Sequence, residues 1–407
     1  MELLSGGQPL LKGPTLARGT SQNGVRLYHQ RLALSLIRRH GSLPKAEIAR
    51  LTGLSAQTVS VIVRQLELEK LVIKEKPLRG KVGQPLVPFS LNPDGAYSIG
   101  LKVGRHSGDL ILLDLTGKIR RKMHHTYHFP TPQTFMAFVW SGLDELLADL
   151  KPSQRARISG FGIAAPFELW NWKEEIGASH EVFEAWRHFD LVAEIEKLGS
   201  WPVHFSNDAT AACAAELLFG KGHRLHTYAY FFLGYFIGGG VVINGHVFPG
   251  RTGYAGAIGP LPITGSDGKH RQLIHCASLF VLENQLKAAG LDPAEVTPVP
   301  EHWGNMGPEL DIWLERAAAS LATACVATMS VIDFEAIVID GAMPASVRED
   351  LVARTRRAIA RHDLRGLPQF TVEAGSIGSD ARAMGAASLS LSANYIIDRD
   401  VLFKETT

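Results

Sequence analysis

The stretch "TYAYFFLGYFIGGGVVINGHVFPGRTGYAG", residues 227–256, decides the fold class. Apolar residues up to Leu233 are followed by glycines, a second apolar run and the pair Asn244-Gly245, which is a strong hairpin signal. We therefore expect strands joined by tight turns. The glycines at 238–240 leave the backbone bare, as in loops whose N–H groups approach phosphate oxygens. The stretch alone does not show whether the chain transfers phosphate or only retains such a loop.

A similar run, "YSIGLKVGRHSGDLILLDLTGKIRRKMHHTYHF", occurs earlier, at residues 97–129. Each run is followed by helical and strand patterns in the same order. The expected elements are strands 98–103, 108–114, 119–128, 158–163 and 336–341, with helices 132–150, 209–219, 277–288, 309–330 and 379–395. Two copies of a β-β-β-α-β-α unit predict an α/β body with two ribonuclease-H-like lobes and a cleft between them.

The chain of 407 residues is long enough for more than one domain. Lys and Arg outnumber Asp and Glu about two to one over residues 1–95, whereas the remainder is mildly acidic, which suggests a polyanion-binding segment attached to a different body. We expect a DNA-binding domain at 1–92 and a sensor domain at 93–407. The lobes of the sensor are expected at 93–210 plus the helix 379–395, and at 211–378.

The segment "KAEIARLTGLSAQTVSVIVRQLELEKLV", residues 45–72, is typical of a helix-turn-helix. Gly53 stands where the turn needs a positive φ, and Val59 and Ile62 face the preceding helix. The following residues to 92 predict a strand, a basic turn and a returning strand, which together form a wing. The expected DNA-contacting side chains, on the second helix and the wing, are Ser55, Gln57, Thr58, Ser60, Arg64, Arg79 and Lys81.

Composition favours a soluble cytoplasmic protein. Hydrophobic residues make up 45% and charged residues 20% of the chain, and neither a signal peptide nor a long apolar segment is evident. The three cysteines, Cys213, Cys276 and Cys325, form no CxxC pair, which favours a reducing compartment and argues against a zinc site or a disulfide framework.

The motifs together resemble the ROK family of repressors and sugar kinases, within the actin/hexokinase-like superfamily. The residues that resemble it are "SNDATAACAAE" at 206–216, the run 233–259, "IVIDGAM" at 337–343 and "GSDARAMGAA" at 378–387, in the family's order. The resemblance covers nearly the whole chain and includes the winged helix-turn-helix that marks the repressor branch. It implies a two-lobed fold with a sugar site in the cleft.

The resemblance also implies a set of ligand-binding residues. Asn207 and Asp208 match the family's sugar-contacting pair, although either side chain could instead serve only to cap the helix that follows. Ser179 and His180 lie where the family's substrate-side loops run, and Gly256 begins the stretch that matches further sugar contacts. Trp170, Trp172 and Trp186 could stack on a sugar ring, but core packing is the preferred interpretation for each of them.

Several positions depart from the kinase pattern. Lys102 stands where the family's kinases have the acid that positions phosphate and Mg²⁺; a cation could attract phosphate but cannot ligate the metal. Ala257 and Pro260 replace a sugar-contacting Glu and His. His270, His275 and Cys276 lack regular ligand spacing, so we expect no metal and no cofactor. The sequence therefore predicts loss of kinase activity.

The preferred hypothesis is a transcriptional regulator, acting as a repressor of carbohydrate genes. Its partners would be operator DNA, a sugar or sugar-derivative effector and a second copy of the chain, as a dimer or tetramer, with no membrane contact. An ATP-dependent sugar kinase with an appended DNA-binding domain is the alternative, favoured by Asp208 and the intact triple glycine. A regulator that answers to a protein partner is the third possibility.

Overall fold

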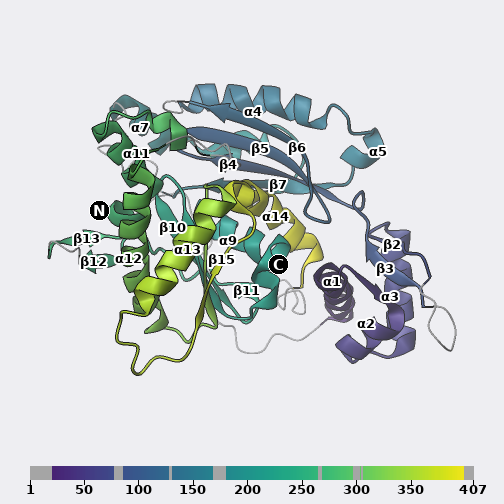
Figure 1. Cartoon of the computed structure of the whole chain (residues 1–407). Coiled ribbons are helices and arrows are strands. Elements are labelled where there is room, and N and C mark those ends of the chain that lie inside the picture. The colour runs from purple at the N-terminus through teal and green to yellow at the C-terminus, as the bar shows by residue number, and fades with distance from the viewer. Residues whose placement is uncertain are drawn as a thin grey trace.

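The computed structural model describes residues 21–77, 86–127, 131–167, 180–264, 268–296, 303 and 306–397. They form a small N-terminal domain beside a larger body of two lobes (Figure 1). Each lobe contains one five-stranded sheet. Two helices pack on each other between these sheets, α9 (Asp208–Phe219) and α14 (Ala381–Tyr395).

The N-terminal domain is a winged helix-turn-helix. Its elements are α1 (Gln22–His40), β1 (Ser42–Pro44), α2 (Lys45–Thr52), α3 (Ala56–Leu68), β2 (Val72–Lys74) and β3 (Pro88–Leu91). Gly53 follows α2 with φ of 70°, and its N–H donates to the carbonyl of Ala49 at 2.9 Å, so the predicted turn is confirmed. Val59 and Ile62 are buried between the helices.

The strands β1, β3 and β2 lie in that order in one antiparallel sheet. This arrangement confirms the two strands predicted to flank the wing. The tip of the wing, including Arg79 and Lys81, lies outside the described residues.

The two lobes repeat one topology. The first lobe consists of β4 (Tyr97–Val103), β5 (Ser107–Asp114), β6 (Ile119–Thr126), α4 (Pro132–Leu147), α5 (Pro152–Arg155), β7 (Ile158–Ala165), α7 (His180–Arg187), α8 (Leu191–Glu196) and β8 (Val203–Asn207). The second consists of η2 (Lys221–Arg224), β9 (Tyr228–Leu233), β10 (Ile237–Ile243), β11 (His246–Val247), β12 (Pro262–Thr264), β13 (His270–Gln272), α10 (Ile274–Ala277), α11 (Leu279–Ala288), η3 (Pro293–Val296), α12 (Glu309–Met329), β14 (Ala336–Gly341), α13 (Ala345–Ile359), β15 (Thr371–Ala374) and η4 (Gly378–Asp380).

The strand orders are β6-β5-β4-β7-β8 and β11-β10-β9-β14-β15, with the first three strands antiparallel and the last two parallel in each sheet. The internal repeat predicted from residues 97–129 and 227–256 is therefore confirmed. Strands β4 and β5 are buried along their whole length because α4 covers one face of the sheet and α14 the other.

Two helices differ from expectation. The predicted helix 277–288 is divided by Ser278, whose hydroxyl accepts the N–H of Ile237 at 2.9 Å and whose carbonyl accepts the Nε1–H of Trp313 at 3.2 Å. Because Ser278 faces two partners in the core, the chain turns there rather than continuing one helix. The helix α13, after β14, was not anticipated; it packs beside α12 (Figure 1).

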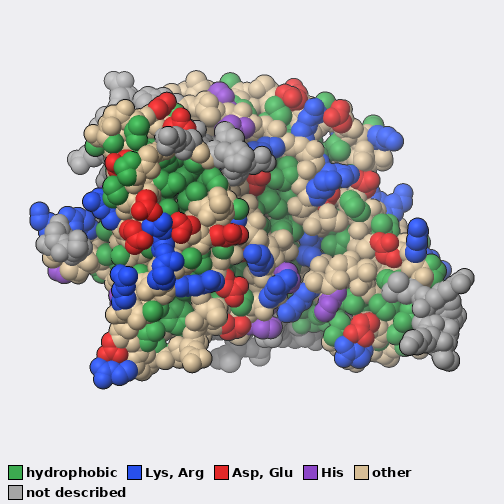
Figure 2. Space-filling model, viewed as in Figure 1, with side chains coloured by type: hydrophobic (Ala, Val, Ile, Leu, Met, Phe, Trp, Pro, Cys, Tyr) green, Lys and Arg blue, Asp and Glu red, His purple; other side chains and the backbone are tan. Residues whose placement is uncertain are grey.

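The surface over α12 and α13 shows acidic and basic side chains side by side (Figure 2). Arg354 of α13 pairs with Asp311 and Glu315 of α12 and with Asp350 of its own helix. Arg354, only 14% exposed, thus joins three carboxylates in one network, whereas an isolated exposed ion pair contributes little to stability. None of the described helices is long and apolar enough to cross a membrane.

Candidate functional site

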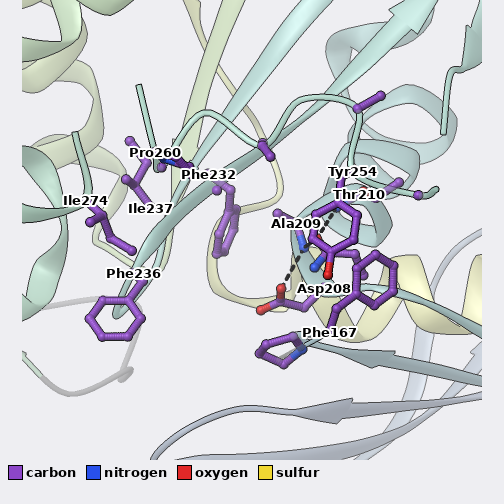
Figure 3. Close-up of a pocket in the computed structure, with 18 of the residues that line it drawn as sticks. Phe167, Asp208, Ala209, Thr210, Phe232, Phe236, Ile237, Tyr254, Pro260 and Ile274 are labelled. Carbon is purple, nitrogen blue, oxygen red and sulfur yellow. Dashed lines mark hydrogen bonds between the residues drawn. The ribbon is translucent and has the colours of Figure 1, made fainter. Parts of the chain in front are cut away.

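A pocket of about 240 Å³ lies between the lobes at the N-terminal end of α9 (Figure 3). The first lobe contributes residues 166–167 after β7 and the side chain of Arg105. The second contributes β10 with the turn before it and residues within 253–260. Asn207 and Asp208, the pair predicted to bind ligand, both line this pocket, as do Ala257 and Pro260.

Asn207 and Asp208 stand at the start of α9, so the predicted ligand-binding pair also caps this helix. The Asn207 Oδ1 accepts the N–H groups of Ala209 and Thr210 at 3.1 and 3.4 Å, and the Asp208 Oδ1 accepts that of Ala209 at 3.0 Å. Capping therefore uses one oxygen of each side chain. The Asn207 amide nitrogen and the second Asp208 oxygen are left for other partners.

That second oxygen of Asp208 faces Arg382, near the start of α14. Its Oδ2 lies 3.4 Å from an Nη of Arg382, and the two side chains are only 15% and 12% exposed. The Arg382 guanidinium also lies 5.1 Å from the ring of Phe232, which lines the pocket. Its Nε is buried and has no hydrogen-bond partner among the described residues.

The segment after β4 and the turn before β10, which would bracket a bound phosphate, contact each other through their side chains. The Arg105 guanidinium, after β4, lies 4.1 Å from the ring centroid of Phe236, before β10. The neighbouring His106 ring stands edge-on to Tyr235 at 4.6 Å. We call these four residues the ring clasp. It places bulky rings beside the glycines of β10, where a phosphate-binding loop needs bare backbone.

Lys102 does not face the pocket. It is buried, and its ammonium donates to the Ser107 hydroxyl at 2.7 Å and pairs with Asp109 at 3.0 Å. Burial lowers the pKa of Lys102 to about 8, against the opposing effect of Asp109. The suggestion that this cation attracts phosphate is therefore wrong, because its donors are held inside the first lobe.

The other sequence-predicted ligand residues lie elsewhere. Gly256 is not part of the pocket wall; with φ of 80° it packs so closely on β10 that a Cβ would stand 2.5 Å from the Gly240 Cα. Ser179 lies outside the described residues, as do Trp170 and Trp172. His180 is the first residue of α7, but its side chain lies outside the described part.

Two further candidates belong to the scaffold. Trp186 is buried in the core of the first lobe against Phe135, with ring centroids 5.7 Å apart, so it does not stack on a ligand in the pocket. His270 lies in β13 and contacts Thr264 at 3.1 Å. Among the described residues no group of three or more His, Cys, Asp or Glu side chains has the arrangement of a metal site, and this includes the region of His275 and Cys276.

The predicted DNA-reading helix α3 exposes a continuous face. Gln57, Ser60 and Arg64 are exposed, and Val61 on the same face is 65% exposed. The hydroxyls of Ser55 and Thr58 contact each other at 2.8 Å, and Ser55 caps the helix by accepting the Thr58 N–H at 3.1 Å. Ser55 and Thr58 are therefore already partly engaged in capping α3.

The winged domain is packed on the far ends of α9 and α14. An Nη of Arg31 donates to the carbonyl of Ala393 at 2.7 Å, and the N–H of Ile397 donates to the Ser35 hydroxyl at 3.2 Å. Arg38 lies 5.5 Å from the ring centroid of Phe219, the last residue of α9, and burial lowers its pKa to about 10. Apolar residues of both domains form one continuous core cluster.

Sequence reasoning missed several functional candidates. Phe167, Tyr254 and Phe232 line the pocket, and Arg382 holds Asp208, yet none lies in a pattern that marks a binding residue. Arg382 stands within the quoted motif 378–387, but 174 positions separate it from Asp208. Val61, on the exposed face of α3, was also missed. Its place could have been inferred from the sequence, because it lies one helical turn from Gln57 and Arg64.

The chain matches two families. The ROK family profile matches residues 98–393 and the MarR family profile matches residues 27–80. An uncharacterised protein of Sinorhizobium fredii is 25% identical over 362 residues, which is 88% of this chain and 89% of that protein.

Two regulators are also similar. The xylose repressor of Bacillus spizizenii is 30% identical over 244 residues, 60% of this chain and 62% of the repressor. The DNA-binding transcriptional dual regulator NagC of Escherichia coli is 23% identical over 259 residues, 63% of this chain and 62% of the regulator. The matched part of the chain spans less than two thirds of the length of either regulator.

Solved structures share the fold. A ROK family transcriptional regulator, a homologue of the Escherichia coli MLC protein, superposes with a TM-score of 0.64 and 20% identity, covering 91% of this chain and 97% of that chain. The ROK family glucokinase of Streptomyces griseus, in complex with glucose and AMPPNP, gives 0.57 and 19%, covering 72% of this chain and 99% of the glucokinase. At these identities the likeness concerns the fold alone.

Proposed function

The chain belongs to the ROK family, and from this premise we propose that it is a DNA-binding transcriptional repressor whose kinase-like body senses a sugar or a sugar derivative. The winged domain, with its exposed α3 face, is the DNA-binding part. The names of the xylose repressor and the regulator NagC support a carbohydrate effector. The pocket at Asn207 and Asp208 is the proposed effector site.

One observation in the structure carries this proposal: α9 and α14 both begin at the pocket and end on α1. Asp208 opens α9 and Arg382 lies in the first turn of α14, while Phe219 and Ala393, at their other ends, contact the winged domain. A ligand that engages Asp208 competes with Arg382 and shifts the two helices relative to each other. Because α1 rests on both, the winged domain moves with them.

The test is DNA binding by the purified full chain to the DNA upstream of its own coding region, measured by fluorescence anisotropy at fixed salt with and without a sugar panel. We expect at least one sugar to weaken binding about ten-fold. Arg38→Met should keep DNA binding but reduce the ratio of DNA affinities measured without and with the sugar. Arg39→Met, at an exposed neighbouring position on α1, should leave both the binding and the ratio unchanged. Equal affinity for upstream and random DNA would contradict the proposal.

We propose further that the body has no sugar kinase activity. Lys102 occupies the position of the metal-positioning acid and is itself engaged by Asp109. The ring clasp, with Arg105 against Phe236, fills the space beside the β10 glycines. Asp208, the residue that would accept the hydroxyl proton, faces Arg382. ATP turnover on a hexose and amino-sugar panel, abolished by Asp208→Asn, would instead favour the kinase alternative.

The operator is proposed to be bound by a homodimer, since two winged domains would read two half-sites one helical turn or more apart. Footprinting of the upstream DNA measures this directly. Two protected half-sites related by a dyad are expected, and a single short protected segment would contradict the dimer.

A further inference from the structure

The pocket has two ends of different chemistry. Figure 3 shows Asp208, Phe167 and Tyr254 at one end and Phe236, Ile237, Pro260 and Ile274 at the other, with Phe232 between them. The first end offers hydrogen-bonding groups, the Asn207 amide nitrogen and the Asp208 carboxylate, whose Oδ2 faces Arg382 at 3.4 Å, beside two rings 4.9 Å apart. The second end consists of apolar side chains, and three of these, Phe236, Ile237 and Ile274, are less than 10% exposed.

Two backbone groups at the apolar end, the N–H of Ile237 and the carbonyl of Gly259, are already paired. The N–H of Ile237 donates to the Ser278 hydroxyl at 2.9 Å, and the carbonyl of Gly259 accepts the N–H of Ile274 at 3.0 Å. The strand β10 pairs with β9 along this edge. A ligand hydroxyl placed against the side chains of Ile237, Ile274 and Pro260 would lose water partners and gain none from those side chains, which is unfavourable.

The charges in the wall lead to the same conclusion. Within the described part of the wall, Arg105 and Asp208 are the charged side chains. Asp208 belongs to the polar end, and the Arg105 guanidinium lies beside the apolar end, 4.1 Å from the ring centroid of Phe236. At positions 257 and 260 this chain has Ala and Pro, where the family resemblance implies a Glu and a His that contact sugar hydroxyls.

We propose that the effector is a monosaccharide with one apolar edge, either a deoxy sugar or a glycoside with a small apolar aglycone. Its hydroxylated edge lies at Asn207 and Asp208, and its apolar edge lies against Ile237, Ile274 and Pro260. The cavity of about 240 Å³ equals the liquid volume of roughly eight water molecules, which suits one sugar ring with a small substituent. This inference rests on the proposed sugar-sensing function.

The test compares matched ligands by isothermal titration calorimetry on the full chain. One arm pairs a hexose with its 6-deoxy counterpart, for glucose, galactose and mannose, and the other pairs methyl with phenyl glycosides of the same sugars. We expect the less polar member of at least one pair to bind ten-fold or more tightly than its partner. The arm in which this occurs identifies the apolar group as a ring methyl or an aglycone.

Two variants locate the preference in the pocket. Ala257→Glu, at an exposed position, adds a hydrogen-bonding group without disturbing the core and should reduce the preference at least three-fold. Ile274→Thr should do the same, with Ile274→Val as the control that keeps an apolar, β-branched side chain. Circular dichroism verifies folding of each variant before titration.

The possible results distinguish failure of the apolar-edge inference from failure of the proposed sugar-sensing function. If hydroxyl-rich members bind as tightly as their apolar partners, or more tightly, the apolar-edge inference is wrong while sugar sensing stands. If neither Ala257→Glu nor Ile274→Thr alters the preference, the apolar end has been misassigned. If no ligand binds although the chain still recognises its upstream DNA, the inference fails together with the sugar-sensing part of the proposed function.

Discussion

The close crossing of α9 and α14 can be tested by substitution, because the contact between the two helices has no room for a side chain. A Cβ added at Gly385 of α14 would stand 1.8 Å from the carbonyl oxygen of Ala211 in α9 and 2.2 Å from its carbonyl carbon. Moving α14 away gives no relief, since a Cβ at Gly162 of β7 would stand 1.8 Å from the Ala386 carbonyl oxygen on the opposite side. The helix is therefore held between backbones on both sides.

The substitution Gly385→Ala has two opposing effects. An alanine inside a helix is favoured over glycine by about 1 kcal/mol. Overpacking a core usually costs about 1–3 kcal/mol and occasionally more, and here the obstacle is backbone, which cannot rotate away. We expect the collision to exceed the usual range, so that a net loss of about 2 kcal/mol or more lowers the Tm of the roughly 300-residue body by about 3 °C or more.

The matched control is Gly142→Ala, in the interior of α4. There the added Cβ would meet only side-chain atoms, of Leu110 at 3.3 Å and of Met123 at 3.7 Å. The helix-propensity gain is the same, so Gly142→Ala should leave the Tm unchanged or raise it slightly. Thermal unfolding followed by circular dichroism measures both variants. A Gly385→Ala protein as stable as Gly142→Ala would refute the close crossing on which the connection from pocket to winged domain depends.

Three further predictions concern charge, DNA and catalysis. Burial raises the pKa of Glu283 from 4.5 to about 7, so the folded state binds the proton more tightly and the stability falls as the pH rises through that interval. Glu283→Gln should therefore raise the Tm at pH 8 but not at pH 4.5. Equal Tm shifts at both pH values would contradict the burial argument. Arg64→Ala and Gln57→Ala should each weaken operator binding about ten-fold while circular dichroism stays unchanged, and unchanged affinity would remove α3 from the interface. Asp208→Asn should leave the background ATP consumption of the chain unaltered, because the proposed function assigns that carboxylate to ligand binding.

Local patterns gave the elements and their order. The period-two runs around the Asn244-Gly245 turn, the glycine at 53 and the buried positions Val59 and Ile62 depend on neighbours within one helix or hairpin, and those neighbours are visible in sequence. The division of helix 277–288 at Ser278 was missed, because its cause is the distant partners Ile237 and Trp313.

The site was only half predicted. Asn207 and Asp208 were identified through a motif that occupies adjacent positions at the start of α9. The sequence analysis did not predict the polarity of the pocket. Four of the lining residues come from separate segments and look like ordinary core residues in the sequence: Phe167, Phe232, Tyr254 and Ile274. Gly256 was assigned to the ligand, whereas its place against Gly240 is set by the packing of two loops.

The amino-acid sequence was sufficient to predict a winged helix-turn-helix joined to a duplicated α/β body, and to place Lys102 where the family's kinases have an acid. Hydrophobic period, turn residues and side-chain chemistry are local properties, so they can be read without coordinates. The contacts of Arg382 with Asp208, of Arg105 with Phe236, and of α9 and α14 with α1 became visible only in the folded chain. Each of them joins residues more than a hundred positions apart, and they exist because tertiary packing, rather than any local preference, brings the side chains together.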